Sequence, residues 1–239
     1  MSGKIRIVAH RGASAYEPEN TLVACEKAIE MGADMIEIDV HLSSDCVLVV
    51  IHDYRLGRLI NGRGWVKHQT LAELKELSGG TIPTLEEVID TVKGRCGLYI
   101  ELKGNSTAQL TVELLRLKNF TDVIVASFKG RLIRTAKRIA PEFRTSLLSG
   151  KVGSDFVAMA RSARADYVHL CFESKAAEPH KLLTPELLAE LRAASLGIIL
   201  WHEERPRELQ ELVKLDVDGI CTNTPDLLKT ALDAHLAVH

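Results

Sequence analysis

Residues 35–40 alternate between apolar and acidic side chains. In an extended strand successive side chains point to opposite faces, so Glu37 and Asp39 share a face that the apolar residues do not occupy. Neighbouring carboxylates in an apolar run repel one another and lose hydration unless a cation or a base joins them. A solvated edge strand is the plain alternative, and the apolar surroundings disfavour it. We therefore interpret Glu37 and Asp39 as metal ligands.

More polar residues stand where other apolar runs end. They are His10 and Arg11 after residues 5–9, His52 and Asp53 after 47–51, and Glu101 and Lys103 at the end of the run that begins at Leu98. Each alone has an ordinary explanation, such as a core histidine, a surface arginine or a simple ion pair. Chance placement of three acids, two histidines, an arginine and a lysine at neighbouring strand ends is much harder to accept. We therefore predict one shared site.

The residue types at these strand ends fit one kind of chemistry. Three carboxylates form a hard, all-oxygen site, which suits Mg²⁺ or Ca²⁺ better than zinc. The arginine and the lysine can pair with an anion bound to that metal. The two histidines titrate near neutrality and can act as a base and an acid on opposite sides of a phosphorus centre. The residues alone predict metal-assisted cleavage of a phosphate ester.

The acidic strand is followed closely by its return strand. Residues 43–46 are too few for a crossover helix, so the runs on either side should form an antiparallel hairpin. Pairing Leu42 with Val47 across the turn places His52 opposite Glu37. A slip of one or two residues would still bring His52 close to the acids.

Strand and helix patterns alternate through the rest of the chain. Leaving out the hairpin return, eight strands are predicted, at 5–9, 35–40, 98–102, 123–127, 143–148, 167–170, 198–201 and 219–222. Each is followed by a helix, or by an excursion leading to one, which is typical of a closed (β/α)8 barrel of the TIM type in the α/β class. An open doubly wound sheet fits less well, because no glycine-rich fingerprint follows the first strand.

One domain is predicted over residues 1–239, with one irregular segment. Residues 54–81 are rich in glycine, arginine and polar side chains and hold one short helix pattern at 71–77. We expect this segment to be a small insertion after the second strand, beside the barrel mouth.

Bulk properties exclude several classes of function. The chain of 239 residues is 46% hydrophobic and 26% charged, and its formal charge of -2 offers no basic field for nucleic acid and no polybasic membrane anchor. No apolar run reaches membrane-spanning length. Five cysteines without a C-x-x-C pair favour reduced thiols, so we expect a soluble cytoplasmic protein. The choice between a monomer and a homo-oligomer stays open.

The ordered set of short motifs resembles the bacterial, cytoplasmic type of glycerophosphodiester phosphodiesterase. The motifs are His10-Arg11-Gly12, Pro18-Glu19-Asn20-Thr21, Glu37-x-Asp39, His52-Asp53, Ile82-Pro83-Thr84-Leu85 and Glu101-Leu102-Lys103. They span nearly the whole chain, and their combined spacing is specific although each is weak alone. The resemblance implies a barrel, a divalent cation, and hydrolysis of glycerophosphodiesters to glycerol 3-phosphate and an alcohol.

The resemblance also implies roles for particular residues. Glu37, Asp39 and Glu101 correspond to metal ligands, His10 and His52 to the proton-transfer or nucleophilic pair, and Arg11 and Lys103 to phosphate contacts. The segment 54–81 resembles an insertion that shapes the alcohol side of the site. Direct hydrolysis and attack by a glycerol hydroxyl, through a cyclic phosphate, both stay open.

Some positions depart from the family pattern or have weaker roles. His202 stands where a Thr/Asn-containing run is usual, and Asn223 where an aspartate is common. We expect His202 to be solvent-exposed or structural, and Trp201 to be either a pocket wall or a core residue. Asn20 or Thr21 is predicted to cap the helix that follows, with Asn20 interpreted as a cap and not a ligand, and Asp53 is interpreted as a group that orients His52.

Three rival functions fit the sequence less well. A phospholipase-D-like phosphodiester lyase acting on lysophospholipids would need an apolar groove, for which residues 54–81 offer few apolar side chains. A metal-free sugar-phosphate isomerase barrel would prefer a glycine-rich phosphate loop after the seventh and eighth strands, which is missing. A non-catalytic barrel would be expected to lack some of the acids or histidines, and both sets are complete.

Overall fold

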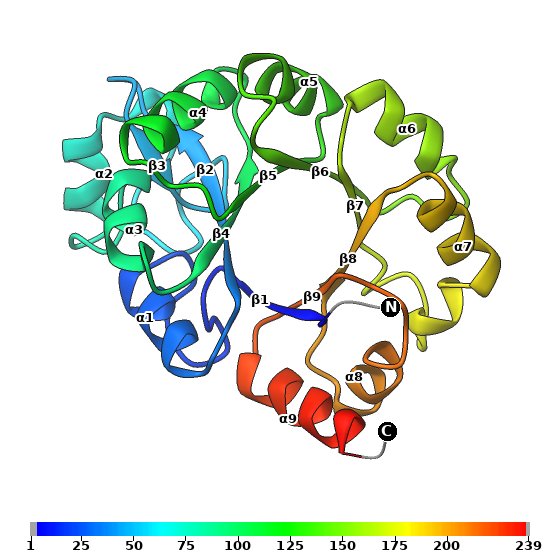
Figure 1. The fold of residues 1–239 in the computed structure, drawn as a ribbon. Helices are drawn as coiled ribbons and strands as arrows, with labels where there is room; N and C mark the ends of the chain where they lie inside the picture. The colour runs from blue at the N-terminus through cyan, green and yellow to red at the C-terminus, as the bar shows by residue number, and fades with distance from the viewer. Residues whose placement is uncertain (1–3, 238–239) are drawn as a thin grey trace.

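The computed structural model describes residues 4–237. Eight parallel strands form a ring with helices on its outside (Figure 1). The strand order is β1-β9-β8-β7-β6-β5-β4-β2, and pairing of β1 with β2 closes the ring. The predicted (β/α)8 TIM-type barrel is therefore confirmed.

The observed elements mostly begin and end within about two residues of their predicted positions. The strands are β1 Arg6–His10, β2 Met35–Leu42, β3 Leu48–Val50, β4 Gly97–Leu102, β5 Val123–Ser127, β6 Arg144–Ser149, β7 Tyr167–Leu170, β8 Gly197–His202 and β9 Gly219–Thr222. The helices are α1 Leu22–Glu30, α2 Leu71–Leu77, α3 Leu85–Val92, α4 Thr107–Leu117, α5 Gly130–Ile139, α6 Phe156–Ala163, α7 Pro185–Ala193, α8 Pro206–Leu212 and α9 Pro225–Leu236. Two 3₁₀ turns, Val66–His68 and Pro179–Leu182, were not predicted.

The hairpin between β2 and β3 forms as predicted, but in a different register. Leu42 pairs with Leu48, one residue further along than the predicted partner Val47. The cause lies in the turn, where the Ser43 amide donates to the Val47 carbonyl at 3.0 Å and the Ser43 hydroxyl accepts from the Val47 amide at 2.9 Å. The amide of Ile51 then donates to the carbonyl of Asp39 at 2.9 Å, which places Ile51 opposite Asp39. His52 comes one residue later and therefore does not face Glu37.

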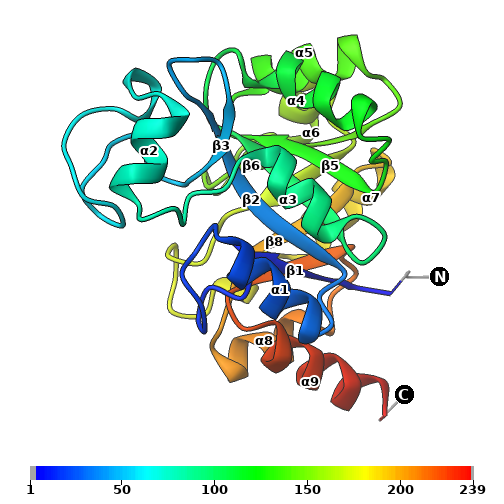
Figure 2. The same cartoon turned by 90° about the vertical axis from the view of Figure 1, so that its left-hand side faces the viewer.

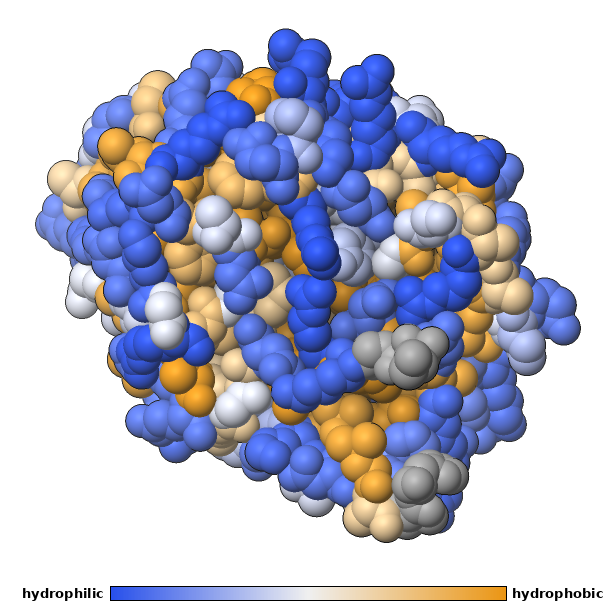
Figure 3. Space-filling model, viewed as in Figure 1, coloured by the Kyte–Doolittle hydropathy of each residue, from blue (hydrophilic) through white to orange (hydrophobic). Residues whose placement is uncertain are grey.

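Apolar side chains fill both the space under the helices and the inside of the ring. The interior cluster consists of Val8, Met35, Tyr99, Ile124, Ala126, Leu148, Tyr167, Ile199 and Cys221. Arg144 and Arg6 cover the end of the ring where the strands begin, by donating to the Tyr167 hydroxyl at 2.7 and 3.5 Å. Figure 3 looks onto this end and shows hydrophilic residues across its centre. The other end of the ring, where the strands finish, is where the active sites of such barrels lie.

The segment 54–81 packs beside β3 and outside the ring. Together with β3 and the residues around it, the segment buries an apolar cluster of Val49, Ile51, Leu56, Ile60, Val66, Leu74 and Ile82. A capping box between Thr70 and Glu73 starts its helix α2. Figure 2 shows α2 standing off the barrel on the side where β1 ends, away from the last turn of α9.

Two further observations bear on the sequence-based expectations. Within residues 4–237 no helix has both the length and the apolar character needed to cross a lipid bilayer. All five cysteines are free thiols.

A close backbone approach fixes the loop that follows β1. Gly12 adopts a left-handed φ of +82°, and a Cβ atom there would lie 2.6 Å from the carbonyl carbon of Ala24 in α1. The neighbouring Ala13 amide donates to the Ala24 carbonyl at 2.9 Å, which holds the loop against the helix. Only glycine combines this φ with so little room.

We predict that Gly12→Ala lowers the free energy of unfolding by about 3 kcal/mol, because backbone overlap adds to the cost of a left-handed alanine. Gly79→Ala is the matched control, since Gly79 has a φ of +62° with nothing within 4 Å of the added Cβ. It should cost only about 1 kcal/mol. Urea unfolding followed by circular dichroism measures both, and equal losses would contradict the role of the close approach.

Candidate active site

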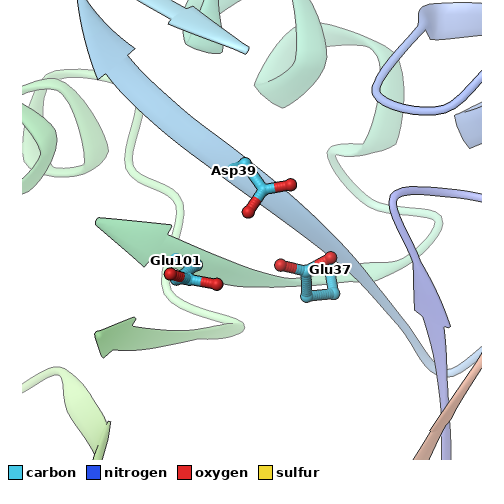
Figure 4. Close-up of side chains that lie close together, drawn as sticks. All are labelled: Glu37, Asp39 and Glu101. Carbon is cyan, nitrogen blue, oxygen red and sulfur yellow. The ribbon is translucent and has the colours of Figure 1, made fainter. Parts of the chain in front are cut away.

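Three carboxylates meet at the end of the barrel where the strands finish. Glu37 and Asp39 project from β2 and Glu101 from β4, and parallel pairing sets Asp39 beside Glu101. Carboxylate oxygens of all three lie within 4.8 Å of one another, and Figure 4 shows the groups turned toward a common space. The side chains are almost fully buried, with exposed fractions of 4%, 1% and 7%. The structure thus brings together the three acids that the sequence singled out.

Two cations compensate part of this buried negative charge. Lys103 Nζ lies 2.9 Å from Asp39 Oδ1 and 2.7 Å from Glu101 Oε1. The backbone amide of Arg11 donates to Glu37 Oε2 at 3.0 Å. Arg11 Nε lies 3.3 Å from Asp39 Oδ2 but is not aligned for a hydrogen bond. Both predicted phosphate contacts therefore border the acid cluster.

The acids respond differently to this environment. Burial, and then the charge of Asp39, raises the pKa of Glu37 well above its usual value. Burial alone would also raise the pKa of Asp39, but Lys103 and Arg11 outweigh it and hold that pKa low. Burial raises the pKa of Glu101 to about 7. The cluster therefore carries less negative charge near neutrality than three separate acids would.

A divalent cation fits this set of donors. Three carboxylates from two rigid strands offer only oxygen, which hard cations prefer, and their spacing allows one ion to contact all of them. A dication would also favour the ionised forms of the two acids whose pKa burial raises.

Asn20 has a role that the sequence analysis missed. The helix cap predicted at this position is instead supplied by Thr21, whose side chain accepts from the Ala24 amide. The Asn20 amide group donates to Asp39 Oδ2 at 2.9 Å, and its carbonyl oxygen accepts from the Asp39 backbone amide at 3.1 Å. Asn20 therefore fixes the orientation of one carboxylate of the cluster.

His10 is held on two sides at the end of β1. Its Nδ1 lies 2.7 Å from Asn223 Oδ1, which can only accept, so Nδ1 carries the proton and Nε2 keeps its lone pair. The His202 ring stacks on the His10 ring at 4.4 Å between centroids. His202 is only partly buried, and this stacking is a structural contact of the kind expected for it. Burial, then the charges of Arg11 and His202, lower the pKa of His10 well below its usual value, so the ring is neutral near pH 7.

His52 follows β3 and is oriented by its neighbour. Its Nδ1 lies 2.8 Å from Asp53 Oδ1, which is the orienting contact that the sequence predicted. His41 Nε2 donates to the His52 carbonyl at 3.2 Å. These two contacts fix the ring and the backbone of His52.

Except for Asp39, the candidate residues line one cavity of about 190 Å³. Its lining consists of His10, Arg11, Glu37, His52, Glu101, Lys103, Phe128, Leu148, His169, Cys171, Glu173, Trp201, His202 and Cys221. Larger hollows exist, such as one of about 570 Å³ between β1 and α9, but none of these candidates lines it. The smaller cavity is therefore the candidate active site.

Trp201 and His169 line this cavity and are also buried in the protein interior. Trp201 is both a pocket wall and a core residue, because it is 1% exposed and packs on Phe172. Tyr99 donates to or accepts from His169 Nδ1 at 3.0 Å inside the ring. Burial, followed by the charge of His202, lowers the pKa of His169 to about 3. His169 is therefore a buried neutral group.

Comparisons with known proteins agree with this geometry. Residues 10–227 match the family model described as the glycerophosphoryl diester phosphodiesterase family. A glycerophosphodiester phosphodiesterase of Caldanaerobacter subterraneus subsp. tengcongensis is 33% identical over 94% of this chain and 96% of its own. The crystal structure of a glycerophosphodiester phosphodiesterase from Agrobacterium tumefaciens superposes with a TM-score of 0.82 at 31% identity, covering 95% of this chain and 100% of that one. An Oleispira antarctica phosphodiesterase in complex with the product sn-glycerol-3-phosphate gives 0.85 at 26% identity, covering 95% and 96%.

We predict that His169 makes the protein less stable as the pH falls. Its folded pKa of about 3 lies below the unfolded value of 6.5. The stability that its neutral ring contributes is therefore complete above pH 6.5 and is lost as the pH falls toward 3. The loss should approach about 1 kcal/mol per pH unit. Urea unfolding of His169→Gln between pH 7 and 4 should show a shallower decline than the native chain. The exposed control His68→Gln should keep the native slope, and parallel slopes for all three proteins would refute the assignment.

Proposed function

The chain belongs to the glycerophosphoryl diester phosphodiesterase family, and we propose that the cavity at its barrel mouth is where it hydrolyses glycerophosphodiesters to glycerol 3-phosphate and an alcohol. The observation that carries this proposal is a cluster of three buried carboxylates from adjacent strands, two of which line one cavity together with two imidazoles.

Glu37, Asp39 and Glu101 are the proposed ligands of a divalent cation, either Mg²⁺ or Ca²⁺. Such a cation, when bound, supplies positive charge that polarises a phosphoryl oxygen and stabilises the transition state. Arg11 and Lys103 are the proposed phosphate contacts. Support comes from their place in the cavity lining and from the Arg11 Nε donor, which has no aligned partner among the described residues.

His10 is proposed as the base or nucleophile of the reaction. Its neutral ring and its Nε2 lone pair suit either role, because a protonated imidazole could do neither. The ring can take a proton from a water, or from the neighbouring glycerol hydroxyl if a cyclic phosphate forms first. Analysis of the phosphorus products by ³¹P NMR distinguishes these routes.

His52 is proposed as the acid that protonates the departing alcohol. Asp53 accepts from Nδ1, so Nε2 is the atom that can deliver a proton. The insertion 54–81 is proposed to shape the alcohol side. Its first residue, Tyr54, donates to the Lys103 carbonyl at 3.1 Å. Trp201, which lines the cavity, is proposed as a wall of the pocket. We also propose a cytoplasmic location, which the five free thiols support.

We predict that His10→Ala and His52→Ala each lower turnover of glycerophosphocholine and glycerophosphoethanolamine by about two to four orders of magnitude, because each removes a proton-transfer or nucleophilic group. The measurement is release of glycerol 3-phosphate. His68→Ala, an exposed histidine in the insertion, should keep native turnover. Near-native activity in either site variant would remove that histidine from the mechanism.

Glu101→Ala should act first on metal dependence, because it removes a ligand and leaves both histidines in place. We predict that the concentration of Mg²⁺ or Ca²⁺ needed for half-maximal activity rises about tenfold or more. Glu113→Ala, on the exposed face of α4, should leave the titration unchanged. Separate titrations after chelation identify the preferred ion, and activity that survives chelation would exclude the metal from the mechanism.

A further inference from the structure

Arg58 lies in the segment 54–81 and reaches back to the barrel mouth. Its Nε and Nη2 atoms donate to both Asp53 oxygens, at 2.6 and 3.2 Å. Its Nη1 and Nη2 atoms donate to both Glu19 oxygens, at 3.1 and 2.6 Å. One planar guanidinium thus binds two carboxylates by both of their oxygens. Lysine cannot reproduce this forked contact.

Each of these two carboxylates holds a group of the proposed reaction. Asp53 Oδ1 lies 2.8 Å from His52 Nδ1, on the alcohol side. Glu19 Oε1 accepts from Arg11 Nη1 at 2.8 Å, on the phosphate side. Burial alone would raise the pKa of both carboxyls. Arg58, together with Arg11 at Glu19 and His52 at Asp53, outweighs burial and lowers both pKa values, so both groups stay ionised.

The arrangement depends on the cation at its centre. Asp53 and Glu19 both bind Arg58 Nη2, so without the guanidinium two negative groups would lie close together and repel one another. Either would then move and carry its partner with it. Arg58 itself is half-exposed and is not among the residues that line the cavity, so it is placed to act through the side chains that it holds.

We propose that Arg58 is a positioning residue, which orients His52 and Arg11 together and so couples the insertion to both sides of the phosphorus centre. The inference rests on the proposed function. Because a positioning residue acts on the acid that protonates the leaving alcohol, its loss should matter most for alcohols that need that proton.

Two esters of glycerol phosphate test this dependence. Glycerophosphocholine releases a strongly basic alkoxide unless it is protonated, whereas the p-nitrophenyl ester releases a phenolate that leaves without a proton. We predict that Arg58→Ala lowers kcat on glycerophosphocholine by about 10- to 100-fold, with a clearly smaller loss on the p-nitrophenyl ester. Added guanidinium ion should restore part of the activity, and urea should not. Arg63→Ala, which removes an exposed arginine of the same segment, is the matched control and should match the native enzyme.

Two further variants test the two links separately and guard against misfolding. Asp53→Asn disrupts only the link from Arg58 to His52 and should show the same selective loss. Arg58→Ala added to it should leave the ratio between the two esters unchanged. Glu19→Gln disrupts only the link from Arg58 to Arg11. It should weaken inhibition by glycerol 3-phosphate without changing the ratio of activities on the two esters.

The outcomes distinguish the inference from the proposed function. A native enzyme that cleaves neither ester overturns the proposed function and the inference together. A His52→Ala loss that is equal on both esters overturns the acid role and, with it, the inference. If His52→Ala is selective but Arg58→Ala is native-like, or loses equally on both esters, only the positioning role of Arg58 is overturned.

Discussion

The burial of three like charges is the constraint on which the site depends. Their oxygens lie within 4.8 Å of one another, where little water can reach them. Repulsion at this spacing must be balanced locally, and the chain does so with Lys103 from the end of β4 and Arg11 from the loop after β1. Asn20 in the same loop donates to Asp39 and accepts from its backbone amide, and Gly12 lets that loop lie against α1. Barrel geometry and loop geometry therefore serve one electrostatic requirement.

Much of this arrangement follows from local pattern. Buried parallel strands require short apolar runs, and the helices between them begin at capping residues such as Thr84 and Thr184, so the alternation could be predicted along the chain. Strand periodicity places Glu37 and Asp39 on one face, and parallel pairing then brings Glu101 beside Asp39. The acids could be predicted because their positions depend only on strand geometry.

The groups that hold the histidines could not be predicted in the same way. His10 stacks on His202 and bonds to Asn223, although about two hundred residues separate these partners in the chain, and no local pattern encodes that contact. Asn20 precedes a threonine and so resembles a cap, yet its left-handed backbone, with φ of 59°, turns its amide toward Asp39. The hairpin register depended on one serine hydroxyl in the turn. Each of these contacts involves a loop or the end of a strand, where tertiary contacts decide the conformation.

The apolar cluster under the insertion has a consequence for how such enzymes can diverge. Because Leu56, Ile60 and Leu74 pack against β3 and not inside the ring, the insertion can be lengthened, shortened or exchanged without repacking the barrel. Under the proposed role of the insertion in shaping the alcohol side, selection can act on head-group preference and on fold stability almost independently. A replacement segment would lose the bonds that Arg58 makes from the insertion to Asp53 and Glu19, so it would have to supply a guanidinium at the same place to keep them.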